Sequence, residues 1–155
     1  MKTWPIAEVV PHAGEMILLD SIEAIEAERI VCMRTVRADS LFIDADGSLP
    51  AWVGVELMAQ SIAAWAGCRA RADGQPVQLG FLLGTRQYAC NVDAFPPGSR
   101  LCVEAVRSFH DEHGMGVFTC SIDAPGIRAN ARLTVYRPRN ADAFFEQIAG
   151  EPLHV

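Results

Sequence analysis

The residue best suited to acid–base chemistry in this chain is a lone carboxyl group in an apolar stretch. Glu56 is the only acidic residue in residues 49–66, where apolar and small residues cover every face of a predicted helix. A helix that is apolar all round is buried, and burial favours the protonated form of a carboxyl group. A carboxyl group that keeps its proton near neutral pH can act as a general acid. The open alternative is a buried glutamate that serves packing or subunit pairing.

Two neighbours of Glu56 are candidates for binding a ligand. Gln60 lies four residues further on, so the two side chains share one helix face. It is predicted either to contact the ligand, to position Glu56 or to bond to the sheet. Gly54 lies near the helix start, where free N–H groups and the helix dipole favour negative charge, and a glycine lets a ligand approach the backbone closely. Tight helix packing is the equal alternative for Gly54.

The second candidate for proton transfer is His12, in the predicted turn 11–15. Imidazole titrates near neutral pH and can act as a general base. The alternative is a structural turn in which this imidazole bonds to the backbone. His110 and His113 flank two acidic residues. In a turn between strands that spacing is more typical of a solvated loop than of a metal site, so no metal site is predicted.

Length and composition indicate one globular domain spanning residues 1–155. The 155 residues are 50% hydrophobic and 21% charged, which favours a packed core over disorder. The net charge is −6 and no Lys/Arg run occurs, which argues against nucleic acid and anionic membranes as partners. The five cysteines show no metal-ligand spacing, and no signal peptide is evident, so we expect reduced thiols in a cytoplasmic protein.

One long helix followed by strands predicts an α+β fold. The helix is expected over residues 50–71, with Pro50 in its first turn. Period-2 patterns and turn residues predict strands at 22–27, 29–37, 77–92, 101–109, 117–122 and 129–136, and a short terminal helix at 140–149. Because the helix is apolar on every face, we expect a curved antiparallel sheet to wrap around it, with a second subunit completing its burial.

Three stretches then carry a resemblance to a known family. They are Pro-His followed by an apolar run and Asp (residues 11–20), Glu-Leu-Met-Ala-Gln (residues 56–60) and Pro-Pro-Gly (residues 96–98). Together they resemble the hotdog-fold 3-hydroxyacyl-[acyl-carrier-protein] dehydratases of fatty-acid synthesis. The standard family carries a catalytic histidine in the loop before the helix, whereas the corresponding residues 41–50 contain none. Within the wider family, the pattern is most similar to the dehydratase-like proteins of aryl-polyene biosynthesis clusters.

The resemblance implies a hotdog fold, with the sheet wrapped around a long central helix, and removal of water from a 3-hydroxyacyl thioester held on acyl carrier protein. No metal or redox cofactor is implied. The expected assembly is a homodimer, or a heterodimer with another hotdog protein, that builds its active site across the interface. His12 would be the base and Glu56 the acid, most plausibly from different subunits. Two alternatives stay open: a hotdog acyl-thioesterase, and a non-catalytic hotdog subunit of a hetero-oligomeric dehydratase.

Overall fold

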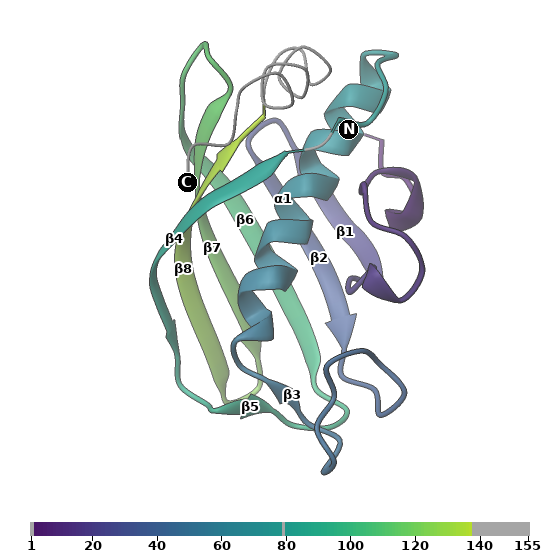
Figure 1. The fold of residues 1–155 in the computed structure, drawn as a ribbon, viewed down its shortest axis with the longest axis vertical. Helices are drawn as coiled ribbons and strands as arrows, with labels where there is room; N and C mark the ends of the chain where they lie inside the picture. The colour runs from purple at the N-terminus through teal and green to yellow at the C-terminus, as the bar shows by residue number, and fades with distance from the viewer. Residues whose placement is uncertain (1, 79, 138–155) are drawn as a thin grey trace, which may run out of the picture.

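A six-stranded antiparallel sheet curves around one long helix (Figure 1). The structure is a computed structural model, and it describes residues 2–78 and 80–137. The strands lie side by side in the order β1-β2-β6-β7-β8-β4, with β3 and β5 forming a separate two-stranded sheet. The elements are β1 Ser21–Glu26, β2 Arg29–Thr35, β3 Leu49–Pro50, α1 Val53–Ala72, β4 Phe81–Cys90, β5 Ala94–Phe95, β6 Arg100–His110, β7 Met115–Ala124 and β8 Ile127–Tyr136.

The strands that the sequence predicts all occur, with ends that shift by a few residues. In β8, residues at alternate positions from 127 to 133 are buried against the helix, because successive side chains of a strand point to opposite faces. The pairing of β3 with β5 was not predicted, since a contact between such short segments leaves no periodic pattern. The predicted terminal helix at 140–149 lies outside the described residues.

The sequence predicted that the helix α1 is buried on every side. In the single chain, α1 packs its inner face on the sheet and leaves part of its outer face accessible. Leu57, Ser61 and Cys68 are fully buried, whereas Ala59 and Ala63 are only half-buried. The reason is geometric, because one sheet covers one face of a helix and the opposite face needs another cover. Within the described residues, no helix combines the length and the hydropathy required to cross a bilayer.

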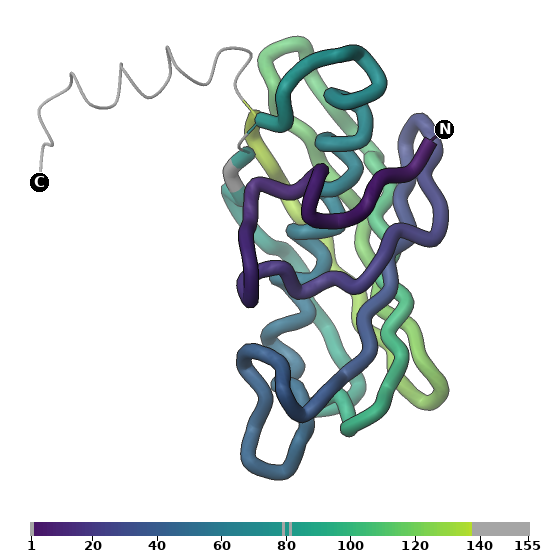
Figure 2. Tube along the Cα trace, turned by 90° about the vertical axis from the view of Figure 1, so that its right-hand side faces the viewer, coloured from purple at the N-terminus to yellow at the C-terminus, as the bar shows by residue number. Residues whose placement is uncertain are grey.

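Part of the outer face of α1 is covered by residues 8–18, which we call the N-terminal strap. The strap follows a short 3-10 helix at Ile6–Glu8 and contains a second one at Gly14–Met16. Figure 1 places it on the side of α1 nearer β1, and Figure 2, viewed from that side, shows it lying over the helix. The strap then continues into β1, so it joins the cover of α1 to the edge of the sheet.

The buried position of Leu57 gives a test of this core. Leu57→Ala removes a side chain with no exposed surface, so we expect it to lower the unfolding free energy by about 2–5 kcal/mol. Met16→Ala is the control, because the Met16 side chain is half exposed and should cost less than about 1 kcal/mol. Chemical denaturation of both variants measures the difference, and equal costs would contradict the packing of α1 on the sheet.

Candidate functional site

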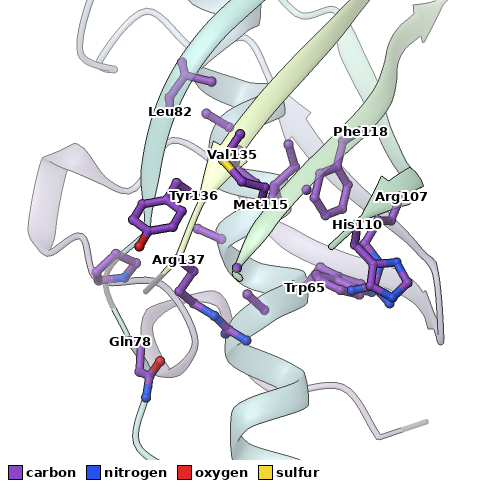
Figure 3. Close-up of a pocket in the computed structure, with 18 of the residues that line it drawn as sticks. Trp65, Gln78, Leu82, Arg107, His110, Met115, Phe118, Val135, Tyr136 and Arg137 are labelled. Atoms are coloured by element: carbon purple, nitrogen blue, oxygen red, sulfur yellow. The ribbon is translucent and has the colours of Figure 1, made fainter. Parts of the chain in front are cut away.

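A cavity of about 610 Å³ lies between α1, the strap, the β6–β7 hairpin and the neighbouring strands β8 and β4. Apart from Glu56, its helix wall is apolar and consists of Ala59, Ile62, Ala63, Trp65 and Ala66. Polar side chains line its rim, and Figure 3 shows several of those far from Glu56 in sequence. An apolar cavity with a few polar groups is the usual form of a small-molecule site.

Glu56 lines this cavity from the first turn of α1. Its side chain is exposed in the single chain, so the predicted burial of this carboxyl group is wrong for the chain alone. The physical reason is that Glu56 lies on the wall of the cavity, so its side chain is not packed against the sheet. A carboxylate in the first turn also interacts favourably with the helix dipole.

His12, in the strap, lines the same cavity as Glu56 of the same chain. The sequence favoured the partner's Glu56 for this pairing, which stays a prediction, because the structure describes one chain and shows only that its own His12 and Glu56 line one cavity. The residue is half-buried, and its Nδ1 atom is buried without a hydrogen-bond partner among the described residues. The structural alternative for His12 requires its imidazole to bond to the backbone. The Nδ1 atom makes no such bond.

Gly54 is buried, and its place is explained by close packing. A Cβ atom at this position would overlap the Tyr88 hydroxyl, which donates a hydrogen bond to the Ala51 carbonyl. Tyr88 is carried by an irregular part of β4, where Gln87 has a φ of 58°. The Gly54 N–H donates to the Ala51 carbonyl at 3.0 Å, so it is already used within the chain. Burial raises the pKa of Tyr88, with the neighbouring Cys90 adding to the effect.

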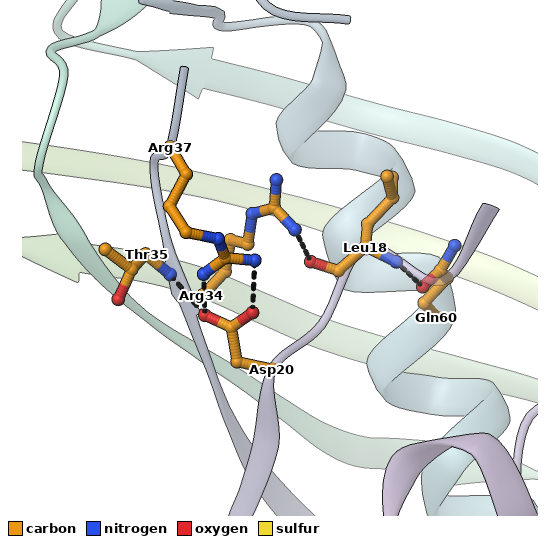
Figure 4. A network of polar contacts seen from close by, with 6 residues as sticks. All are labelled: Leu18, Asp20, Arg34, Thr35, Arg37 and Gln60. Carbon is orange, nitrogen blue, oxygen red and sulfur yellow. Dashed lines mark hydrogen bonds and ion pairs between the residues drawn. The ribbon is translucent and has the colours of Figure 1, made fainter. Parts of the chain in front are cut away.

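Gln60 is 2% exposed and faces the strap rather than the cavity (Figure 4). Its Oε1 accepts a hydrogen bond from the Leu18 N–H at 2.9 Å, and its Nε2 donates to the Met16 carbonyl at 2.6 Å. The amide thus bonds backbone groups 42 and 44 residues away in the sequence. Neither the Glu56 carboxyl nor the sheet takes part in these bonds.

The far end of the cavity holds cations that the sequence did not single out. Figure 3 shows Arg107 and His110 beside Trp65, with Arg137 across the cavity. The guanidinium groups of Arg69 and Arg107 each lie 4.8 Å from the Trp65 ring centroid. Burial, and then the charges of Arg69 and Arg107, lower the pKa of Arg137. These residues come from separate elements, so no local sequence motif indicates that they lie at one cavity.

The hairpin residues His110 to His113 do not form a metal site in the part of the chain that the structure describes, where no group of three or more potential ligands occurs. Asp111 instead accepts hydrogen bonds from the backbone N–H groups of His113 and Met115, at 2.9 and 3.0 Å. These hydrogen bonds lower the pKa of Asp111. The bond from the Met115 N–H is the largest cause, and it outweighs burial, which acts in the opposite direction. The carboxylate is thus part of the turn, while His110 lines the cavity.

Comparison with known proteins identifies the family. The sequence profile of the ApeP-like family, described as ApeP dehydratase, matches residues 4–146. A chain of the dehydratase heterocomplex ApeI:P from Xenorhabdus doucetiae is 31% identical, with 97% of this chain and 100% of that chain covered and a TM-score of 0.87. No curated protein matches the sequence.

Two more distant structures show the fold alone. The PaaI protein from the E. coli phenylacetic acid degradation operon is 15% identical, with 75% of this chain and 81% of that chain covered and a TM-score of 0.57. S. sahachiroi AziG is 20% identical, with 77% and 91% covered and the same TM-score of 0.57. The predicted hotdog fold and the resemblance to the aryl-polyene dehydratases are confirmed, and the chain belongs to the ApeP-like dehydratase family.

Proposed function

We propose that this chain removes water from a 3-hydroxyacyl thioester carried by acyl carrier protein, giving a trans-2-enoyl thioester for polyene synthesis. The observation that carries the proposal is the presence of His12 and Glu56 on the wall of one cavity in a member of a dehydratase family. The apolar helix wall of that cavity suits an acyl chain. The cavity volume of about 610 Å³ is within the usual range for small-molecule sites.

The two side chains have complementary roles in the proposed reaction. His12 takes the C2 proton, and the electron pair of that C–H bond forms the C2=C3 double bond as the C3–O bond breaks. Glu56 gives its proton to the departing hydroxyl group, so that water leaves. The enzyme is restored when the proton on His12 returns to Glu56 through solvent. Negative charge builds on the oxygen of the thioester carbonyl during the reaction, and hydrogen-bond donors must stabilise it. The bound substrate must therefore place this oxygen beside N–H groups of the protein.

The exposed position of Glu56 makes a partner subunit part of this proposal. A general acid must keep its proton near neutral pH, and burial is the usual means. The single chain leaves Glu56 uncovered, so a second hotdog subunit has to cover it. The solved relative from Xenorhabdus doucetiae is itself a heterocomplex, which supports an oligomer of this kind.

The strand β4 is the surface we assign to that partner. It is the last strand of the sheet, and Leu82 and Leu83 on it are 41% and 55% exposed. A long edge strand with apolar side chains is a template for pairing with another chain. Gly80 and Leu82 also line the cavity, so a partner strand on β4 would lie beside the site and could cover Glu56.

The carrier protein and the compartment complete the proposal. Arg107 and Arg137 both line the cavity. The Arg107 guanidinium is paired with the Glu28 carboxylate at 2.6 and 2.9 Å, so Arg137 is the group we assign to the phosphate of a carrier arm. All five cysteines are free, and three of them are buried in the core. We place the reaction in the cytoplasm, where such thiols stay reduced.

A non-catalytic role within a heterocomplex is the second candidate, because two observations favour it. Glu56 is exposed and the loop before α1 carries no histidine, so this chain could complete the site of a second, active hotdog subunit. Such a chain would show no activity alone, and its assembly with the active subunit would keep its rate when His12 is replaced. A His12→Gln variant, assayed as described below for Glu56→Gln, therefore separates the two roles.

Replacing Glu56 tests the proposed acid. Glu56→Gln should keep the fold, because the side chain is exposed, and should lower dehydration by about 10²-fold or more. The assay follows conversion of a 3-hydroxyacyl carrier-protein thioester by mass spectrometry, with the chain alone and with its hotdog partner. Release of a free acid instead of the enoyl product would indicate a thioesterase.

Glu112→Gln is the matched control for this assay. Glu112 lines the same cavity and undergoes the same change of charge, but it lies on the β6–β7 hairpin. Its replacement should leave the rate within a few-fold of the parent rate. Near-full activity of Glu56→Gln in every assembly would show that the helix carboxyl is not the acid.

The proposed interface predicts the effect of a charge on β4. Leu83→Lys places an ammonium group on the edge where the partner would pair, so the assembly should dissociate to single chains at micromolar concentration. Thr119→Lys is the control, because it adds the same charge at an exposed position of the central strand β7. Light scattering or native mass spectrometry gives the masses, and an unchanged mass for Leu83→Lys would exclude β4 as the interface.

A further inference from the structure

The N-terminal strap is anchored to α1 at its start. The Arg71 guanidinium donates to the Glu8 carbonyl at 3.0 and 3.2 Å. One helical turn earlier, the Val9 carbonyl lies so close to Gly67 that a Cβ atom there would overlap it. The first residues of the strap are therefore held against the C-terminal half of α1.

A second anchor holds the end of the strap. Gln60 accepts from the Leu18 N–H, and the Arg34 Nη1 donates to the Leu18 carbonyl at 2.7 Å (Figure 4). Gln60 also donates to the Met16 carbonyl. Both side chains are almost fully buried, with Gln60 2% and Arg34 4% exposed. The strap backbone at residues 16–18 is thus fixed by three hydrogen bonds from the interior.

These anchors lie on one side of the helix. Positions 60, 67 and 71 are separated by seven and four residues, which places them on a common stripe of an α-helix. The strap meets position 71 with its residue 8 and position 60 with residues 16–18, so it runs antiparallel to α1. His12 lies between the two anchors, where the strap reaches the cavity.

A short rigid turn connects His12 to the second anchor. The Met16 N–H donates to the Ala13 carbonyl at 3.2 Å, and the Ile17 N–H donates to the Gly14 carbonyl at 3.1 Å. Ala13 directly follows His12, so a shift of the Met16 backbone is passed on through this turn to the imidazole. The side chain of His12 has no hydrogen bond of its own at Nδ1 that would resist the shift.

Burying the Arg34 guanidinium costs free energy, so a contribution to stability is not sufficient to explain its presence. Its Nε and Nη2 atoms are buried and have no hydrogen-bond partner among the described residues. Burial and the nearby Arg37 lower the pKa of Arg34. Replacing buried charged residues by apolar residues of similar volume often leaves the stability of a protein unchanged or raises it. Stability alone therefore does not account for an arginine at this position.

We propose that Gln60 and Arg34 are positioning residues, which fix the strap so that the His12 imidazole faces the cavity wall that carries Glu56. The inference rests on the proposed function for its catalytic consequence, since it takes His12 as the base. The placement of His12 itself is a structural claim and can be measured without any activity.

Arg34→Met is the main test, because stability and positioning should separate in it. The change removes the bond to the Leu18 carbonyl and also removes two buried nitrogen atoms that have no partner, so the unfolding free energy should stay nearly unchanged. The His12 ring signals, followed by NMR with isotope-labelled histidine, should shift or broaden. The protein has four histidines, and the spectrum of His12→Gln identifies the signal.

The rate provides the second readout. In the active assembly, kcat for Arg34→Met should fall about 10- to 100-fold, as expected for a misplaced catalytic group, with little change in KM. Gln60→Leu should give the same NMR and kinetic changes, whereas Gln60→Glu, whose protonated carboxyl offers one donor and one acceptor, should restore the parent His12 signals. If Arg34→Met fails to fold, the Gln60 pair carries the test.

Ser61→Ala is the matched control for a purely structural effect. Ser61 is fully buried and follows Gln60 in the chain, and its hydroxyl donates to the Leu57 carbonyl of the same helix at 2.9 Å. This variant should lose stability and keep both the His12 signals and kcat. The proposal is overturned if the His12 signals are unmoved in Arg34→Met and Gln60→Leu. Moved signals with an unchanged kcat would support the positioning and reject His12 as the base, so the two failures are distinguishable.

Discussion

A single curved sheet can cover only one face of a helix, whereas α1 is apolar or small-sided almost all round. Leu57, Ser61 and Cys68 are fully buried, so this part of the helix surface is covered. The outer face needs other cover, because apolar surface left in water costs free energy in proportion to its area. The N-terminal strap covers part of it (Figure 1), and the cavity lined by Ala59, Ala63 and Ala66 occupies another part. Both features follow from the mismatch between one helix and one sheet.

The same mismatch puts chemistry on the uncovered side. Glu56 is on the outer side of α1, where the strap brings His12 to the same cavity wall. A carboxyl group in this place is accessible to substrate, which a fully buried one would not be. In the assembly we propose, another subunit completes its surroundings, and the edge strand β4 contributes Leu82 to the cavity wall. Oligomerisation and formation of the site are then two aspects of one burial problem.

The cover itself is held by polar groups rather than by apolar packing alone. Gln60 and Arg34 reach the strap backbone from the interior, and Asp20 at the start of β1 pairs with Arg37 at 2.8 Å. Burial alone would raise the pKa of Asp20, but hydrogen bonds from Arg37 and Thr35 outweigh it and lower that pKa. Hydrogen bonds are directional, so they specify the register of the strap in a way that apolar contact cannot. That specificity matters where a side chain such as His12 must reach one position.

The sequence by itself determined the long helix, the strands that surround it and the motifs of the family, because hydrophobic periodicity and turn residues are local signals. It also identified Glu56 and His12, which the structure places on one cavity. The tertiary structure alone decided that Glu56 is exposed, that Gln60 binds the strap and that Arg107 and Arg137 share a cavity with them. Such facts depend on which segments meet across 40 or more residues of chain, and no local pattern records that meeting. The cover of each helix face is likewise a property of the packed molecule, since periodicity shows that a face is apolar without showing what lies against it.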